Sequence, residues 1–229
     1  MTQPVDICIL VSARAEWRPL LEHFTHVENG YTPYGDCFQK NIDGHRIWFM
    51  HGGWGKVAAA GSTQYAISRW HPKRLINLGT CGGFSGRVQR GEVILARKTI
   101  IYDIIEQMTD PEQANEKYSV EFDLSWLPHP TPQPVKVTTL LSADRDILKE
   151  DIPGLVKKFD ASVADWESGA IAWVARRNNV PCLILRGVSD LVDAQFGEAY
   201  GNYAFFEAQS RIIMANLVEH LPGWLNIFL

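Results

Sequence analysis

Apolar residues along this chain fall into two patterns: short continuous runs, and longer stretches in which they recur every three or four positions. Short runs rich in Val, Ile and Leu predict buried strands, and the helical spacing predicts helices with one buried face. The runs predict strands at residues 6–11, 37–42, 45–51, 74–78, 92–102, 135–141 and 181–188. The spacing predicts helices at residues 12–24, 56–70, 143–150, 166–178 and 203–221. Strands that alternate with helices in this way indicate an α/β fold.

The order of these elements favours a single domain over residues 1–229. Its predicted architecture has three layers, with a mixed, largely parallel central sheet flanked by helices. Pro19 is expected in the first turn of helix 12–24, where its missing N–H breaks no hydrogen bond. Residues 103–134 are polar and rich in proline, which predicts a long, partly irregular excursion of the kind that is often functional or mobile.

Glycines mark three predicted turns. Asp43-Gly44 lies between two strand-like runs and predicts a hairpin. The segments 52–55 and 79–83 follow predicted strands, and glycine there lets backbone N–H groups approach a ligand closely. Neither segment has the spacing of a dinucleotide-binding loop or a Walker loop, although 53–56 resembles a phosphate loop in composition. Tight-turn packing is therefore the expected role of both.

Composition narrows the class of protein. The chain has 229 residues, of which 46% are hydrophobic and 21% charged, and its formal net charge is −4. These values exclude a wholly disordered, collagen-like or coiled-coil protein, and the acidic balance disfavours sequence-independent binding to nucleic acid. No apolar run is long enough to span a membrane, and the segment from Met1 to Pro4, with Asp6 close behind, does not resemble a secretion signal. We therefore expect a cytoplasmic protein with no membrane or nucleic-acid partner.

The sequence supports neither a metal site nor another cofactor. Cys8, Cys37, Cys81 and Cys182 form no CxxC pair, so free thiols in a reducing cytosol are expected. The histidines, His26 among them, show no HExxH spacing.

Three carboxylates stand near predicted strand-to-helix junctions: Glu16, Glu167 and Asp190. In open α/β sheets, ligands bind outside the carboxyl ends of the strands, so these residues are candidates for a shared site. Each also has a plainer interpretation. Glu16 and Glu167 suit the start of a helix, and Asp190, after Ser189, suits a helix or turn cap.

Three stretches in this order resemble the nucleoside phosphorylase and nucleosidase superfamily, and most closely the methylthioadenosine/S-adenosylhomocysteine nucleosidases. They are GWGKVAAA at 53–60, INLGTCGG at 76–83, and Val180-Pro181 through RGVSD at 186–190 to Asp193. The similarity extends over about residues 6–102 and 135–219. The resemblance implies a nucleoside phosphorylase-like fold, a small-molecule nucleoside substrate and no cofactor.

The resemblance also implies roles. Asp190, oriented by Ser189, matches the acid that protonates the imidazole ring of the purine so that it leaves as a neutral base. Glu16 matches the carboxylate that activates water, and Glu167 matches the one that binds the ribose hydroxyls. Arg186 and Thr80 match positions that hold the water. The remaining expected substrate-binding residues are Trp166, Cys81, Gly82 and Ile147.

Hydrolysis is favoured over phosphorolysis. Purine phosphorylases have an arginine at the position of Asn77, and a neutral amide does not replace a guanidinium as a phosphate ligand. A carboxylate at Glu16 suits water and repels phosphate. Arg14 and Arg18 keep phosphate binding open as an alternative.

Departures from the family pattern leave the substrate open. Trp166 replaces a small apolar residue or Met, the segment 142–147 lacks the aromatic residue that stacks on adenine, and 103–134 differs as well. A futalosine-type nucleosidase or an enzyme for another purine nucleoside is the nearest alternative. A non-catalytic nucleoside-binding protein is a third, disfavoured by the three carboxylates.

The prediction of the oligomeric state rests on weaker sequence signals. Trp54, Trp126, Phe205 and Phe206 look exposed and are candidates for a subunit interface, or for the core. The resemblance implies a homodimer.

Overall fold

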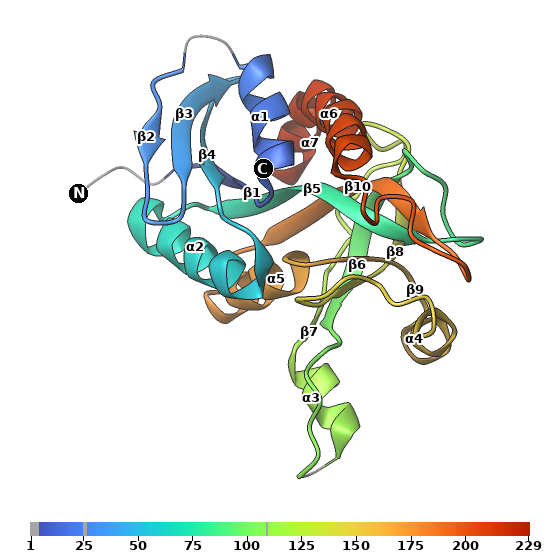
Figure 1. Ribbon diagram of the computed structural model, residues 1–229. Coiled ribbons are helices and arrows are strands. Elements are labelled where there is room, and N and C mark those ends of the chain that lie inside the picture. Colours follow the sequence, from blue (N-terminus) through green and yellow to red (C-terminus); the bar gives the residue numbers. More distant parts are fainter. Residues whose placement is uncertain (1–4, 25–26, 109) are drawn as a thin grey trace.

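The computed structural model of the protein describes residues 5–24, 27–108 and 110–229 (Figure 1). The predictions that concern Met1 to Pro4 and His26 lie outside the described residues. The strands are β1 Ile7–Val11, β2 Gly30–Tyr31, β3 Asp36–Ile42, β4 His45–His51, β5 Arg74–Phe84, β6 Val93–Ile101, β7 Ser119–Glu121, β8 Lys136–Ser142, β9 Ala161–Asp165 and β10 Cys182–Val192. The helices are α1 Arg14–His23, α2 Gly55–Trp70, α3 Pro111–Lys117, α4 Ile152–Phe159, α5 Ser168–Arg177, α6 Tyr203–Glu219 and α7 Leu221–Phe228.

The strands form one mixed sheet, as predicted. Parallel pairings join β4, β1, β5 and β10, and β3 continues the sheet through the antiparallel hairpin at Asp43-Gly44. Beyond β10 the pairing passes through β6, β8 and β9 and returns antiparallel to β5, so five strands close on one another. The carboxyl ends of β1, β4, β5 and β10 consequently share one edge.

Helices cover both faces of the sheet, and strand β1 shows how the sequence pattern places them. Its residues Ile7, Ile9 and Val11 pack in a cluster with side chains of α1, α6 and α7. Cys8 and Leu10 alternate with them and pack in a cluster with side chains of α2 and α5. The three-layer α/β fold is therefore confirmed, and Figure 1 shows α1 and α6 on one side of the strands and α2 and α5 on the other. The four cysteines are free, and no helix in the described ranges is long and apolar enough to cross a membrane.

The glycine segment 79–83 is not a turn, which corrects the prediction. Strand β5 runs straight through it and pairs with β10 as far as Val192↔Phe84. The glycines are needed for space and not for a turn. A Cβ on Gly79 would lie 2.8 Å from Glu16 Oε1, and one on Gly83 would lie 2.7 Å from Val188 Cγ1. A long-range packing requirement thus produced a sequence signal that resembles a turn.

Residues 143–150 form no helix, contrary to the prediction, and α4 begins later at Ile152. Tertiary hydrogen bonds hold the segment in an irregular path. The Asp144 N–H donates to Asp103 Oδ2 at 3.0 Å, and the Tyr200 hydroxyl donates to the Ile147 carbonyl at 2.7 Å. Ile147 of this segment lines the cavity, whereas Leu148 is exposed.

Smaller differences concern element boundaries. Pro19 lies inside α1 and not in its first turn, because the helix already begins at Arg14. Strand β9 and helix α7 were not predicted, and the excursion 103–134 contains α3 and β7 between irregular stretches. Asp190 lies within β10, beside a register shift between Val188 and Asp190, so its interpretation as a cap is wrong.

Candidate active site

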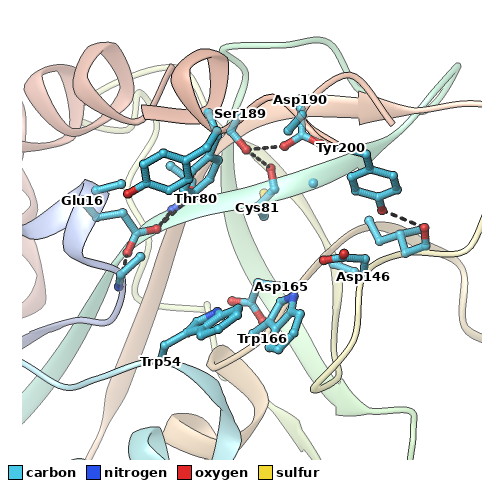
Figure 2. Close-up of a pocket in the computed structure, with 18 of the residues that line it drawn as sticks. Glu16, Trp54, Thr80, Cys81, Asp146, Asp165, Trp166, Ser189, Asp190 and Tyr200 are labelled. Atoms are coloured by element: carbon cyan, nitrogen blue, oxygen red, sulfur yellow. Dashed lines mark hydrogen bonds between the residues drawn. The ribbon is translucent and has the colours of Figure 1, made fainter. Parts of the chain in front are cut away.

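A cavity of about 750 Å³ opens at the edge where the carboxyl ends of the strands meet (Figure 2). Nine of the ten residues predicted for the site line it: Glu16, Thr80, Cys81, Gly82, Ile147, Trp166, Glu167, Ser189 and Asp190. The tenth, Arg186, lies fully buried beside them. The structure therefore brings together groups from β5, β10, α1 and the segments that follow β8 and β9.

Glu16 is a first-turn residue of α1, and its side chain also lines the cavity. Its Oε2 accepts a hydrogen bond from the Ala13 N–H at 3.0 Å, which caps the helix. Its Oε1 accepts from the Thr80 N–H at 2.6 Å and the Thr80 hydroxyl at 2.8 Å. Only 2% of Glu16 is exposed. These bonds, from the start of its own helix and from the distant strand β5, fix the carboxylate in one orientation.

Arg186 is the buried cation that balances the acids. Its Nη2 lies 2.9 Å from Asp165 Oδ2, 3.9 Å from Glu167 Oε2 and 2.7 Å from Asn77 Oδ1, and its Nη1 lies 3.7 Å from Glu16 Oε1. Burial opposes the charge, but the surrounding carboxylates outweigh it and hold the pKa of Arg186 above its usual value. Nη1 has no hydrogen-bond partner among the described residues.

Asp190 carries the features of a proton donor. The Ser189 hydroxyl lies 2.5 Å from Asp190 Oδ1 and 3.2 Å from the Cys81 carbonyl oxygen, which fixes the side chain (Figure 2). Burial raises the pKa of Asp190, with Glu198 and Asp146 adding to the effect against the opposing hydrogen bond from Ser189. A carboxyl group with a raised pKa retains its proton closer to neutral pH and can donate it.

Glu167 stands immediately before α5 and accepts a hydrogen bond from the first residue of α2, at the end of the glycine segment 52–55. Its Oε1 accepts from the Gly55 N–H at 3.0 Å, while the neighbouring Lys56 N–H donates to Asp144 Oδ1 at 2.7 Å. The first two N–H groups of α2 therefore bind carboxylates of the protein itself, in the way that the N–H groups of a phosphate loop bind a ligand. Burial, Asp165 and Glu16 raise the pKa of Glu167 to about 8 despite Arg186.

The raised pKa of Glu167 predicts a pH effect on stability. Between about pH 4.5 and 8 the folded protein binds a proton at Glu167 that the unfolded chain has released. The free energy of unfolding therefore falls as pH rises through this window, by up to about 1.4 kcal/mol per pH unit from this group. We expect Glu167→Gln to reduce that slope in urea denaturation at pH 5, 6, 7 and 8. Glu150→Gln, at an exposed glutamate outside the cavity, should keep the wild-type slope. An unchanged slope in Glu167→Gln would contradict the assignment.

The three residues considered as phosphate ligands, Asn77, Arg14 and Arg18, lie in different surroundings. Asn77 is fully buried, donates from Nδ2 to the Leu10 carbonyl at 2.9 Å and accepts from Arg186, so it is part of the supporting network. Arg18 forms an exposed ion pair with Glu207 at 3.4 Å and does not line the cavity. Arg14 does line it.

Three aromatic residues that were not predicted for the site also line the cavity. Tyr200, Tyr203 and Phe206 come from the segment between β10 and α6 and from the start of α6. Local sequence offered no signal for them, because only the path of the chain after β10 brings them to the site. Trp166 stacks on Trp54 with ring centroids 4.5 Å apart and an interplanar angle of 24°.

The prediction of exposed aromatics was correct for only one residue. Trp54 is 67% exposed, whereas Trp126, Phe205 and Phe206 are half-buried. Trp126 packs on Phe228, Phe205 lies under the Arg90 guanidinium, and Phe206 lines the cavity. Asp165 was also missed as a site residue, although it pairs with Arg186 and accepts from the Ser142 hydroxyl at 2.6 Å.

Known proteins resemble the chain over most of its length. The family model described as the phosphorylase superfamily matches residues 6–221. A 5′-methylthioadenosine/S-adenosylhomocysteine nucleosidase of Tolumonas auensis is 24% identical over 230 residues, which cover 94% of this chain and 100% of that protein. The nucleosidase of the same name from Marinomonas sp. is 24% identical over 194 residues, covering 78% and 83% of the two chains.

Solved structures share the fold. A mutant of Helicobacter pylori MTAN with 5′-methylthioadenosine in its active site superposes with a TM-score of 0.79 at 20% identity, covering 96% of this chain and 99% of that one. Futalosine hydrolase of Helicobacter pylori gives a TM-score of 0.79 at 21% identity, covering 95% and 97%.

Proposed function

The chain belongs to the phosphorylase superfamily, and within it we propose that the protein hydrolyses the N-glycosidic bond of a purine nucleoside modified at its 5′ carbon. One observation carries the proposal. The same cavity holds Asp190, a buried carboxyl group with a raised pKa, and Glu16, a buried carboxylate fixed by Thr80. An acid and a base that act on a glycosidic bond are the minimum that its hydrolysis needs.

Asp190 is proposed as the acid. The bond between the anomeric carbon and the purine breaks, its electron pair stays with the base, and the Asp190 proton moves to the imidazole ring of that base. Loss of a neutral purine costs far less than loss of an anion. Burial of Asp190 keeps it protonated for this step, and Ser189 orients it.

Glu16 is proposed as the base. As the sugar becomes positively charged, a water attacks the anomeric carbon and gives one proton to the Glu16 carboxylate. Arg186 is fully buried behind Glu16, with Nη1 3.7 Å from Glu16 Oε1, and is proposed to hold this carboxylate in place. Glu167 is proposed to bind the ribose hydroxyls, with bonds that strengthen as charge grows on the sugar.

The names of the relatives suggest the substrate class. The similar nucleosidases are named for 5′-methylthioadenosine and S-adenosylhomocysteine, and one similar structure is a futalosine hydrolase. We propose one of these substrate types for this chain. Trp166, Cys81, Gly82 and Ile147 are proposed to contact the substrate because they line the cavity next to the carboxylates.

Phosphorolysis is the second candidate, favoured by Arg14, a guanidinium at the cavity wall. Hydrolysis has more support, because Asn77 is committed to Leu10 and Arg186, and the glycine loop binds Glu167 and Asp144. The position at which purine phosphorylases have an arginine and the N–H groups that resemble a phosphate loop are thus both occupied by groups of the protein itself, and Arg14 is the cation left for an anion.

The decisive assay measures free base released from 5′-methylthioadenosine, S-adenosylhomocysteine, futalosine, adenosine and inosine, with and without phosphate. We expect release from at least one 5′-modified nucleoside in phosphate-free buffer, at a rate that added phosphate leaves unchanged. Release that requires phosphate would establish the phosphorylase alternative. Absence of release, combined with binding of a nucleoside by calorimetry, would favour a non-catalytic binding protein.

A single domain, a homodimer and a cytoplasmic location are proposed alongside this activity. The candidate site draws on residues from Glu16 to Asp190, so a domain division between them would separate its parts. Of the four aromatic residues considered for a subunit contact, Trp54 is the one that is exposed.

A further inference from the structure

One end of the cavity is built from the segments that follow β1 and β4. These strands pair in parallel up to Val11↔His51, so the residues just beyond them, including Arg14 and Trp54, lie at the same end. Asp190 belongs to β10, which is separated from β1 by β5. Arg14 lies two residues before Glu16 and Trp54 lies next to Gly55, which binds Glu167, so a sugar held by these two carboxylates has both side chains within reach of its 5′ substituent.

Stacked indoles form an apolar wall beside the proposed sugar position. Trp166 immediately precedes Glu167, and Trp54 immediately precedes Gly55, whose N–H donates to Glu167 Oε1. The two indoles stack on each other and both line the cavity (Figure 2). Because Trp54 remains 67% exposed, the wall reaches from the sugar position to solvent. A 5′ substituent that extends from the sugar at this position contacts apolar surface along its length.

Arg14 differs from the other cations at the cavity. Arg145 is paired with Asp151 at 2.6 Å, and Arg186 is surrounded by carboxylates. Arg14 has no hydrogen bond or ion pair with any residue in the described ranges, and its side chain is exposed at the cavity wall. A guanidinium offers donors in a planar fork that matches a carboxylate.

We propose that the 5′ substituent of the substrate has an apolar part that packs on Trp54 and Trp166 and ends in a carboxylate that Arg14 binds. This inference rests on the proposed nucleosidase function and makes it more specific. A carboxylate fits better than a phosphate co-substrate, because Arg14 is a single cation and Glu16, two residues away, repels a dianion more strongly than a monoanion.

The test compares two substrates that differ only in charge: 5′-deoxy-5′-(4-carboxybenzylthio)adenosine and its 4-carbamoyl counterpart. We expect the wild-type protein to have a kcat/KM about tenfold higher for the carboxylate, mainly through a lower KM. Arg14→Gln should abolish this preference, and Arg14→Lys should restore part of it. Arg18→Gln is the matched control, since Arg18 lies on the same helix outside the cavity, and it should keep the full preference.

Three other results would contradict the proposed role of Arg14, and they show whether the nucleosidase function fails with it. Cleavage of both substrates with equal kcat/KM, or a preference that survives in Arg14→Gln, would overturn the role of Arg14 and leave the nucleosidase function standing. Cleavage that depends on phosphate in the wild type, with the dependence weakened in Arg14→Gln, would assign Arg14 to phosphate and overturn the inference. Cleavage of neither substrate, with or without phosphate, would remove the inference together with the function on which it rests.

Discussion

The Asp190→Asn variant is expected to lose about 10³- to 10⁴-fold in kcat for base release, the upper part of the range for general acid catalysis. Asparagine is nearly isosteric and can still accept the hydrogen bond that Ser189 makes to Oδ1, but it has no acidic proton for the purine. Because burial raises the pKa of Asp190, replacement by a neutral amide should leave the free energy of unfolding equal or slightly higher near pH 7.5.

Two further measurements make this prediction specific. Wild-type kcat/KM should fall as pH rises through the pKa of Asp190, since only the protonated carboxyl group donates. Asp193→Asn is the matched control, because Asp193 lies a few residues on, accepts hydrogen bonds from Gln195 and Phe196 and does not line the cavity. It should keep wild-type turnover. Full activity in Asp190→Asn would refute the proton-donor role.

For Glu16→Gln we expect a decrease in kcat of at least about 100-fold, with a smaller change in KM. Glutamine cannot take a proton from water, and its single carbonyl oxygen cannot replace both carboxylate oxygens, which accept from Ala13 and Thr80. The measurement is steady-state release of free base in phosphate-free buffer, together with thermal unfolding to verify the fold.

The control for Glu16 lies on the same helix. Glu22 pairs with Arg211 at the surface of α1, so Glu22→Gln should retain wild-type kcat. If Glu16→Gln were as fast as the wild type, another group would have to activate the water, and the assignment of Glu16 would be wrong.

Elements with a complete local signal were predictable from sequence. Strand β1 is a continuous apolar run, and the β3–β4 hairpin has Asp43 and Gly44 at positive φ, as a two-residue turn requires. Helix α2 follows its glycine loop as expected. Failures occurred where distant groups determine the backbone path. Residues 143–150 look helical but are held by Asp103 and Tyr200, and Gly79 looks like a turn residue although the side chains of Arg186 and Glu16 require its small size.

In the candidate site, too, some features were predictable from sequence and others were not. Its three carboxylates could be named from sequence because they follow recognisable strands and match a family pattern. The raised pKa of Glu167 could not be predicted, since it arises from burial and from neighbours such as Asp165. Tyr200, Tyr203 and Phe206 reach the cavity only through the course of the chain after β10.

The sequence by itself determined the α/β fold class and most of the buried strands, because short-range patterning dictates which residues must leave water, and it named three carboxylates that line the cavity. The tertiary structure alone decided that Arg14 and Trp54 share one end of the cavity and that Arg186 lies buried among Asp165, Glu16 and Glu167. Strand pairing and side-chain packing between distant segments set these positions, and local patterns carry no record of which distant partner a residue will meet.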